Sequence, residues 1–399
     1  MTPPSSFFLL SLFLGGALIA GTKARGIPRD TQILLVGAFG IRIVYVAIDS
    51  VLGIFAGDGD FPLYDEALWH VAQQWRVGDF LAPLTFLNGD NFLTVYTFAY
   101  GSAYTVFGHH PTLVRVLVAM TGVLFVYNIY RITRQLDSHR SGMYAAGFAA
   151  IYPYWIQLSG IFYRDMLVML LLTEVVYLLL RWIDDRGHHA VILAGLVATI
   201  TFSLRLVNIV PVGAAFAVAT YVKLNESRWQ KPLAILLMLI AVLSTILLFG
   251  DKITVQELAS RRAWLAREST AAYLTGVIYE NFVELLAFLP VGASYFFLVP
   301  FPWQLVNLLA VIALLQNVFL WYPAVVLSIF GVRRLIPTRT GELLVLLAYL
   351  ESGVAIYGLV EGNIGPAMRH RSQFQFVVIV LAGIVLAKRT KFKVKLAIS

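Results

Sequence analysis

Long apolar runs separated by short charged segments constrain this sequence more than any other feature. About eleven of them approach the 17–25 residues that an α-helix needs to cross the hydrocarbon core of a bilayer. They cover residues 6–22, 31–56, 112–131, 141–158, 165–182, 189–204, 206–223, 231–249, 304–331, 341–358 and 372–388. Two further stretches, 92–108 and 272–300, are broken by Gly, Pro and polar residues, and are interpreted as re-entrant, interfacial or additional spans. The sequence therefore predicts an all-α, polytopic transmembrane helical bundle of about 11–13 spans.

Composition leaves little room for a soluble domain. Of the 399 residues 59% are hydrophobic and 13% are charged, whereas roughly a quarter of a soluble protein is charged. We therefore expect one integral membrane domain over residues 1–399. The first run is followed, not preceded, by Lys23 and Arg25, which favours a retained span over a secretory signal peptide. No cysteine is present, which excludes disulfides, thiolate metal sites and cysteine nucleophiles.

The basic residues predict the topology. With eleven spans, alternate loops hold about 19 of the 30 Lys and Arg residues, and the positive-inside rule assigns these loops to the cytoplasm. Residues 389–399 are then a short basic cytoplasmic tail beside anionic lipid. The net charge of +8 is explained by this topology, and we do not expect the protein to bind nucleic acid. A prokaryotic plasma (inner) membrane is favoured, with the active face toward the periplasm or exterior; the endoplasmic reticulum is the alternative.

The opposite side carries two long external loops, residues 57–111 and 250–303, and most of the acidic residues. In the first loop, Tyr64–Trp75 places four apolar side chains on one helical stripe and predicts a helix on the membrane surface. The stripe consists of Leu68, Val71, Ala72 and Trp75. In the second loop, Arg261, Arg262 and Arg267 are expected to bind either a carrier phosphate or lipid headgroups.

An acidic pair stands where the second span enters the first long loop. Asp58 and Asp60 are separated and preceded by glycines, which let the backbone turn so that both carboxylates converge. Such a pair can abstract a proton or hold a divalent metal ion. A solvated turn is the alternative.

Charged residues also gather at the outer ends of later spans. Arg164-Asp165 lies between two spans, where a charged pair in lipid is costly unless it is hydrated or functional; a mutual ion pair is the alternative. Arg205, at an outer helix junction, either extends to the interface or binds phosphate. Arg369-His370-Arg371 precedes the last span and suggests a bound anion, or else surface salt bridges with Glu361.

Two other groups of ionisable residues are given structural interpretations. Arg42 and Asp49 are two turns apart in one span, and we expect them to pair through water or neighbours. The doublet His109-His110 is expected to lie in a solvated loop.

Taken in order, these features resemble the GT-C superfamily of integral membrane glycosyltransferases, in the branch of protein O-mannosyltransferases and lipid A aminoarabinose transferases. The resemblance covers most of the chain through short motifs. They are Asp58-Gly59-Asp60-Phe61-Pro62-Leu63-Tyr64, Phe107-Gly108 to Arg115, Tyr130 to Arg134, Ala145 to Ser159 with Pro153, Arg164-Asp165, and Arg369-His370-Arg371. Members often carry a soluble domain after the membrane part, whereas this sequence ends with Lys388 to Ser399, so the acceptor is not carried over.

The resemblance implies transfer of a sugar from a polyprenyl-phosphate or -pyrophosphate carrier to a hydroxyl of a lipid, glycan or protein acceptor, with inversion at the anomeric carbon. A carboxylate must take the hydroxyl proton, and Asp60 is the first candidate, with Asp58 as partner or alternative. Tyr64 and Asp65 are expected to position substrate. Asp58 and Asp60 are also the candidate ligands for Mg²⁺, Mn²⁺ or Ca²⁺, and no other cofactor is expected.

Cations are expected to stabilise the departing phosphate. Arg369 and Arg371, with His370, are the first candidates, followed by Arg205 and Arg164. Asp165 is expected to orient an arginine, complete a metal site or position the acceptor. An oligosaccharide polymerase or ligase, and a lipid-linked glycan flippase, are the alternative functions; a flippase would be expected to show internal repeats and a charged cavity through the bundle.

Overall fold

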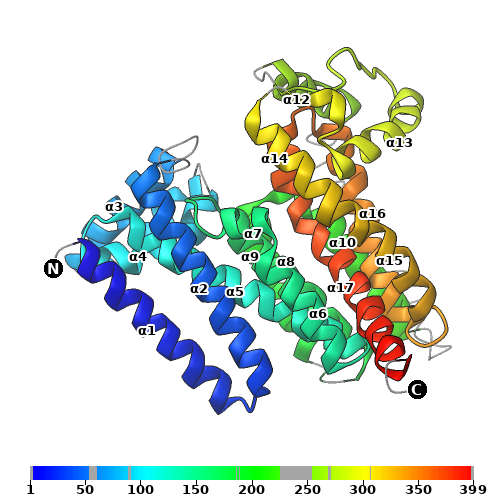
Figure 1. The fold of residues 1–399 in the computed structure, drawn as a ribbon. Helices are drawn as coiled ribbons and strands as arrows, with labels where there is room; N and C mark the ends of the chain where they lie inside the picture. Colours follow the sequence, from blue (N-terminus) through cyan, green and yellow to red (C-terminus); the bar gives the residue numbers. More distant parts are fainter. Residues whose placement is uncertain are drawn as a thin grey trace. The chain divides into compact units, whose positions relative to one another are not determined.

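A computed structural model describes residues 3–53, 61–88, 91–185, 187, 189–224, 254–267, 271–305 and 307–396 (Figure 1). These residues are almost entirely helical, and no strand occurs among them beyond an isolated bridge between Ala272 and Asn363. Eight of the described helices are long and apolar enough to cross a membrane. The predicted all-α, multi-pass membrane architecture is therefore confirmed.

The chain forms two compact units. The first contains residues 1–174 and 196–206, and the second contains residues 175–195 and 207–399. Helices of the first unit are α1 (Pro3–Ala24), α2 (Arg29–Leu52), α3 (Phe61–Arg76), η1 (Ala82–Asn88), α4 (Asn91–Phe107), α5 (Pro111–Leu136), α6 (His139–Ile151) and α7 (Pro153–Leu158). Helices α8 (Asp165–Ile183) and α9 (His189–Leu204) contribute to both units.

The second unit contains the remaining elements. They are η2 (Leu206–Asn208), whose first residue belongs to the first unit, α10 (Ile209–Leu224), α12 (Val255–Arg267), α13 (Phe282–Leu298), η4 (Pro302–Gln304), α14 (Leu308–Gln316), the π-helical turn η5 (Asn317–Trp321), α15 (Tyr322–Leu335), α16 (Thr340–Val360) and α17 (Ile364–Leu396). Residues 389–396 of the predicted basic tail continue α17 as helix.

Most predicted spans correspond to one helix, whereas the run 304–331 contains α14, the π-helical turn η5 and part of α15. The run 141–158 is divided into α6 and α7 because Pro153 cannot donate to the preceding turn and instead starts a new helix. The run 189–204 forms α9, a shorter apolar helix. In the two interrupted stretches lie α4 and α13, and the run 231–249 lies outside the described residues.

In the first unit, α5 is the central helix and packs against α1, α2, α4 and α6. Close approach depends on small residues: a Cβ on Gly142 would lie 2.8 Å from the Tyr130 ring. Helix α3 is present as predicted, but its apolar stripe is buried against α4, where Val71 and Trp75 pack on Gly101. The stripe therefore has a protein partner, which the sequence interpretation did not foresee.

In the second unit, α16 and α17 are the most extensively packed helices, contacting α10, α13 and α15. The backbones of α13 and α16 touch at Gly292 and Gly358: a Cβ on Gly358 would lie 2.6 Å from the backbone nitrogen of Ala293. Small residues at such crossings allow the close van der Waals packing that holds helices together in lipid.

Candidate functional site

A buried ion pair joins the start of α8 to the end of α9. Asp165 is the first residue of α8, and Arg205 follows the last residue of α9. Their side chains are 2% and 9% exposed, and Arg205 Nη2 lies 2.8 Å from Asp165 Oδ1. A carboxylate is also favourable at a helix N-terminus, where the backbone N–H groups are unpaired. Arg205 thus has an acidic partner in Asp165, and the roles expected for Asp165 in the reaction stay predictions.

Arg164, next to Asp165, faces an aromatic cluster. Its guanidinium lies 4.1 Å from the centre of the Phe92 ring, a distance at which a cation is attracted to the ring face. Tyr64 packs edge-on against Phe92 and at 4.5 Å from Tyr96, and it is only 2% exposed. Tyr64, predicted to position substrate, therefore lies in the packing between α3 and α4.

Two buried arginines hold the turn that precedes Arg164. Arg42, fully buried, donates to Ser159 Oγ at 3.1 Å and to the Ala150 carbonyl at 3.2 Å. Arg115 donates to the Gly160 carbonyl. Gly160 itself lies against Tyr45, whose ring atoms would be 2.5 Å from a Cβ at this position. The turn leading to Asp165 is therefore held by side chains from α2 and α5.

The partner of Asp49 was not recognised from the sequence. Asp49 forms an ion pair with Arg115 at 2.5 Å, with side chains 2% and 4% exposed. The expected association of Asp49 with Arg42 through water or neighbours is thus replaced by a direct pair between α2 and α5. The only sequence sign was that each residue is an isolated charge near the end of an apolar run.

Asp65 lies in a small polar cluster. Its Oδ1 accepts a hydrogen bond from the Tyr104 hydroxyl, and its Oδ2 lies 2.9 Å from His109 Nε2. Burial raises the pKa of Tyr104, and the adjacent carboxylate adds to that shift, so the phenol remains a donor. His109 lies in an exposed loop, as expected, with 44% of its side chain exposed; in addition it pairs with Asp65 and lies 5.0 Å from the Trp69 ring.

In the second unit, Arg371 is buried beneath the end of α13. One guanidinium nitrogen donates to the carbonyls of Phe297 and Val299 at 3.0 and 2.7 Å, and the other donates to Asn317 Oδ1 at 3.1 Å. The guanidinium also lies 5.5 Å from the Trp321 ring centre. These contacts give Arg371 a packing role that its position in the sequence did not reveal.

His370 pairs with Glu361, the structural alternative recognised from the sequence, and Glu361 is 2% exposed. The Glu361 carbonyl accepts a hydrogen bond from Arg262, which also donates to the carbonyls of Tyr273 and Leu274. Arg262 is 2% exposed, so it holds the second loop on this segment. This differs from the expectation that it binds a carrier phosphate or lipid headgroups. Arg369 is half-buried.

Several predicted residues lie outside this description. Asp58 and Asp60 are not among the described residues, so their pairing and their metal binding stay predictions. Within the part of the chain that is described, no group of three or more His, Asp or Glu side chains is placed to hold a metal ion. The first unit brings Asp165 and Arg205 together; the second contains Arg369, His370 and Arg371.

The matched residues support the overall interpretation. Residues 94–249 match the model of the dolichyl-phosphate-mannose-protein mannosyltransferase family. This is a GT-C superfamily family, so the resemblance seen in the sequence is confirmed, and the match indicates a membrane glycosyltransferase of GT-C type. The matched stretch contains both Asp165 and Arg205. No curated protein matches the chain.

Proposed function

We propose that this protein transfers a sugar from a polyprenyl-phosphate or -pyrophosphate carrier to a hydroxyl acceptor on the outer face of the membrane. The observation that carries the proposal is the buried Asp165–Arg205 pair, which lies inside the stretch matched to a family of lipid-phosphate-dependent glycosyltransferases. A desolvated, oriented guanidinium suits a phosphate group better than a mobile surface arginine, because its position is fixed before the charge develops.

The proposed reaction uses a single base. Asp60, in the sequence immediately before α3, takes the proton of the acceptor hydroxyl as the oxygen attacks the anomeric carbon. The bond between that carbon and the phosphate oxygen breaks, and its electron pair leaves with the carrier phosphate. Asp58 assists Asp60 or replaces it as base, and a divalent ion at this pair remains part of the proposal. Attack opposite the leaving group inverts the anomeric carbon.

Arginines are the proposed ligands of the carrier phosphate, and each unit has its own candidates. In the first unit, the candidates are Arg205, which is oriented by Asp165, and Arg164, which precedes Asp165 in the sequence. In the second unit, Arg369 is the preferred phosphate ligand because it is half-buried on a segment that the contacts of Arg371 and His370 hold in place. Membrane lipid surrounds the bundle, and the active face is assigned to the periplasm or exterior with the C-terminus in the cytoplasm.

The test is release of label from radiolabelled polyprenyl-phosphate sugars by protein in nanodiscs. We expect Asp60→Asn to reduce release by about 10²–10⁴-fold, the contribution of a general base. Asp79→Asn is the matched control, because Asp79 is an exposed aspartate of the same loop that caps the Leu81 amide, which asparagine can also do. Wild-type turnover in the Asp60 variant would reject the assignment of the base.

The same assay separates the alternatives. A polymerase or ligase would consume lipid-linked oligosaccharide and would not depend on Asp60. A flippase would move the carrier across the membrane without releasing label. Either result, obtained with folded protein, would replace the proposed function.

A further inference from the structure

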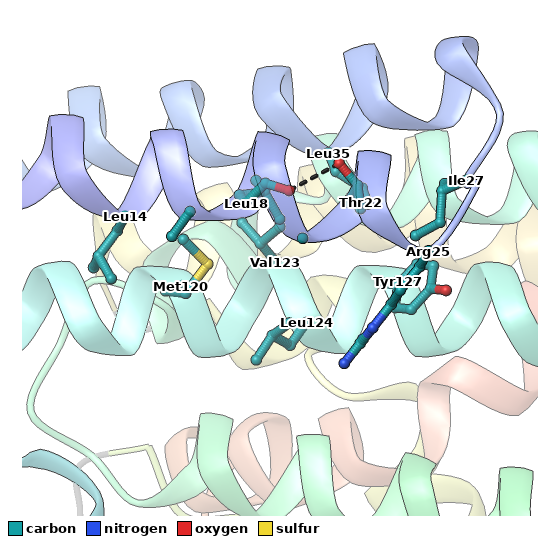
Figure 2. A pocket seen from close by; sticks show the side chains of 12 residues that line it. Leu14, Leu18, Thr22, Arg25, Ile27, Leu35, Met120, Val123, Leu124 and Tyr127 are labelled. Atoms are coloured by element: carbon teal, nitrogen blue, oxygen red, sulfur yellow. Dashed lines mark hydrogen bonds between the residues drawn. The ribbon is translucent and has the colours of Figure 1, made fainter.

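A pocket of about 280 Å³ lies between α1, α2 and α5 of the first unit (Figure 2). Most of its lining side chains are aliphatic or aromatic. They include Leu14, Leu18, Leu35, Met120 and Tyr127, whereas Thr22 and Arg25 are polar members of the lining. None of these residues has a part in the proposed glycosyl transfer.

The pocket is apolar along its length and charged at one end. Figure 2 shows Leu14 toward one end and Arg25 with Ile27 at the other, where α1 turns into α2. Thr22 adds little polarity, because its hydroxyl donates to the carbonyls of Leu18 and Ile19 in its own helix. Arg25 is exposed, and Lys23 at the end of α1 and Arg29 at the start of α2 add charge of the same sign.

The surrounding surface is suited to lipid. Phe8, Leu12 and Phe13 of α1 are 62%, 57% and 72% exposed, so this helix presents large apolar side chains outward while lining the pocket with others. Helix α1 is also one of the candidate membrane spans. An occupant that enters from beside α1 therefore comes from the bilayer.

We propose that this pocket binds one acyl chain of an anionic phospholipid, whose headgroup phosphate is held by Arg25. The aliphatic lining matches the chain, and the basic turn matches the headgroup. The basic end is also the end that the positive-inside rule assigns to the cytoplasmic leaflet, where anionic lipids are concentrated. This lipid site is independent of the proposed glycosyl transfer.

The chain-binding part is tested by filling the pocket. Protein is exchanged into nanodiscs of equimolar phosphatidylglycerol and phosphatidylcholine with identical acyl chains, extracted, and analysed by native mass spectrometry for retained lipid. Gly21 lines the pocket, and a Cβ there meets no atom within 4 Å, so the leucine side chain of Gly21→Leu can extend into the pocket without a clash. Gly16→Leu is the matched control, because Gly16 is on the same helix, is equally unobstructed and lies outside the pocket lining.

We expect wild type and Gly16→Leu to retain one phospholipid, and Gly21→Leu to lose it while eluting as folded protein. Equal retention by Gly21→Leu, or no retained lipid in wild type, overturns the proposal. A wild-type dimer that Gly21→Leu converts to monomer would assign the pocket to a second copy of the chain and would also overturn it.

The charged part is tested with a second matched pair. Arg25→Gln should reduce the preference for phosphatidylglycerol over phosphatidylcholine about fivefold, the effect of one basic residue near an anionic surface. Arg29→Gln removes the same charge from the start of α2, outside the pocket lining, and should change the preference less. Equal effects of both variants would show general attraction to the surface and overturn the assignment of the headgroup to Arg25.

Discussion

Replacing Asp165 with asparagine is expected to destabilise the folded protein by about 3–5 kcal/mol. The magnitude follows from burial: Asp165 and Arg205 are 2% and 9% exposed and 2.8 Å apart. Asparagine preserves the size of the side chain but removes its charge, so Arg205 is left charged in a site from which solvent is excluded. Arg205→Gln should have a cost of the same order, because it leaves the Asp165 carboxylate in the same position.

The double variant isolates the pair. Asp165→Asn combined with Arg205→Gln contains no unpaired charge, so it should be less destabilised than the sum of the single variants by at least about 2 kcal/mol. Asp185→Asn is the control: Asp185 pairs with Lys223 but is 64% exposed, and such pairs contribute about 0–1 kcal/mol. Its positive φ of 58° also suits asparagine.

The assay is the free energy of unfolding in detergent micelles titrated with sodium dodecyl sulfate, followed by loss of helical circular dichroism. Single variants that cost less than about 1 kcal/mol, or a double variant equal to the sum of the singles, would refute the reasoning, because they would show that both charges are hydrated and uncoupled.

Two further predictions concern packing in the second unit. Gly358→Ala should lower the stability of the folded protein by about 1–3 kcal/mol, because the added Cβ would lie 2.6 Å from the Ala293 backbone nitrogen, which cannot move aside. The control is Gly213→Ala in α10, whose Cβ meets no atom within 4 Å and which should leave the stability unchanged or increase it. Thermal unfolding measures both variants. Arg262→Met should increase the rate of amide hydrogen exchange in α12 by about tenfold or more, since charged hydrogen bonds to three carbonyls are lost. The control Arg261→Met, at an exposed position of the same helix, should not change that rate. Equal exchange rates in both variants would contradict the anchoring role of Arg262.

The sequence predicted helices better than it predicted their partners. Apolar runs located α2, α5, α8 and α16 closely, because a lipid-spanning helix must satisfy its own backbone hydrogen bonds and so depends mainly on length and hydrophobicity. The stripe of α3 was also recognised, yet a stripe at helical spacing is equally suited to lipid and to another helix, and here it packs on α4.

The ionisable residues show the same division. The sequence by itself determined which charges interrupt apolar segments. A charge buried in such a segment needs a compensating partner, so Asp49, Asp165 and Arg205 can be recognised from the hydrophobicity pattern alone as residues that need one. Only the tertiary structure decided the compensation: Asp49 with Arg115, Asp165 with Arg205, and Arg371 with the carbonyls that end α13. These partners are distant in sequence and are brought together by helix packing, whereas hydrophobicity along the chain is a local property.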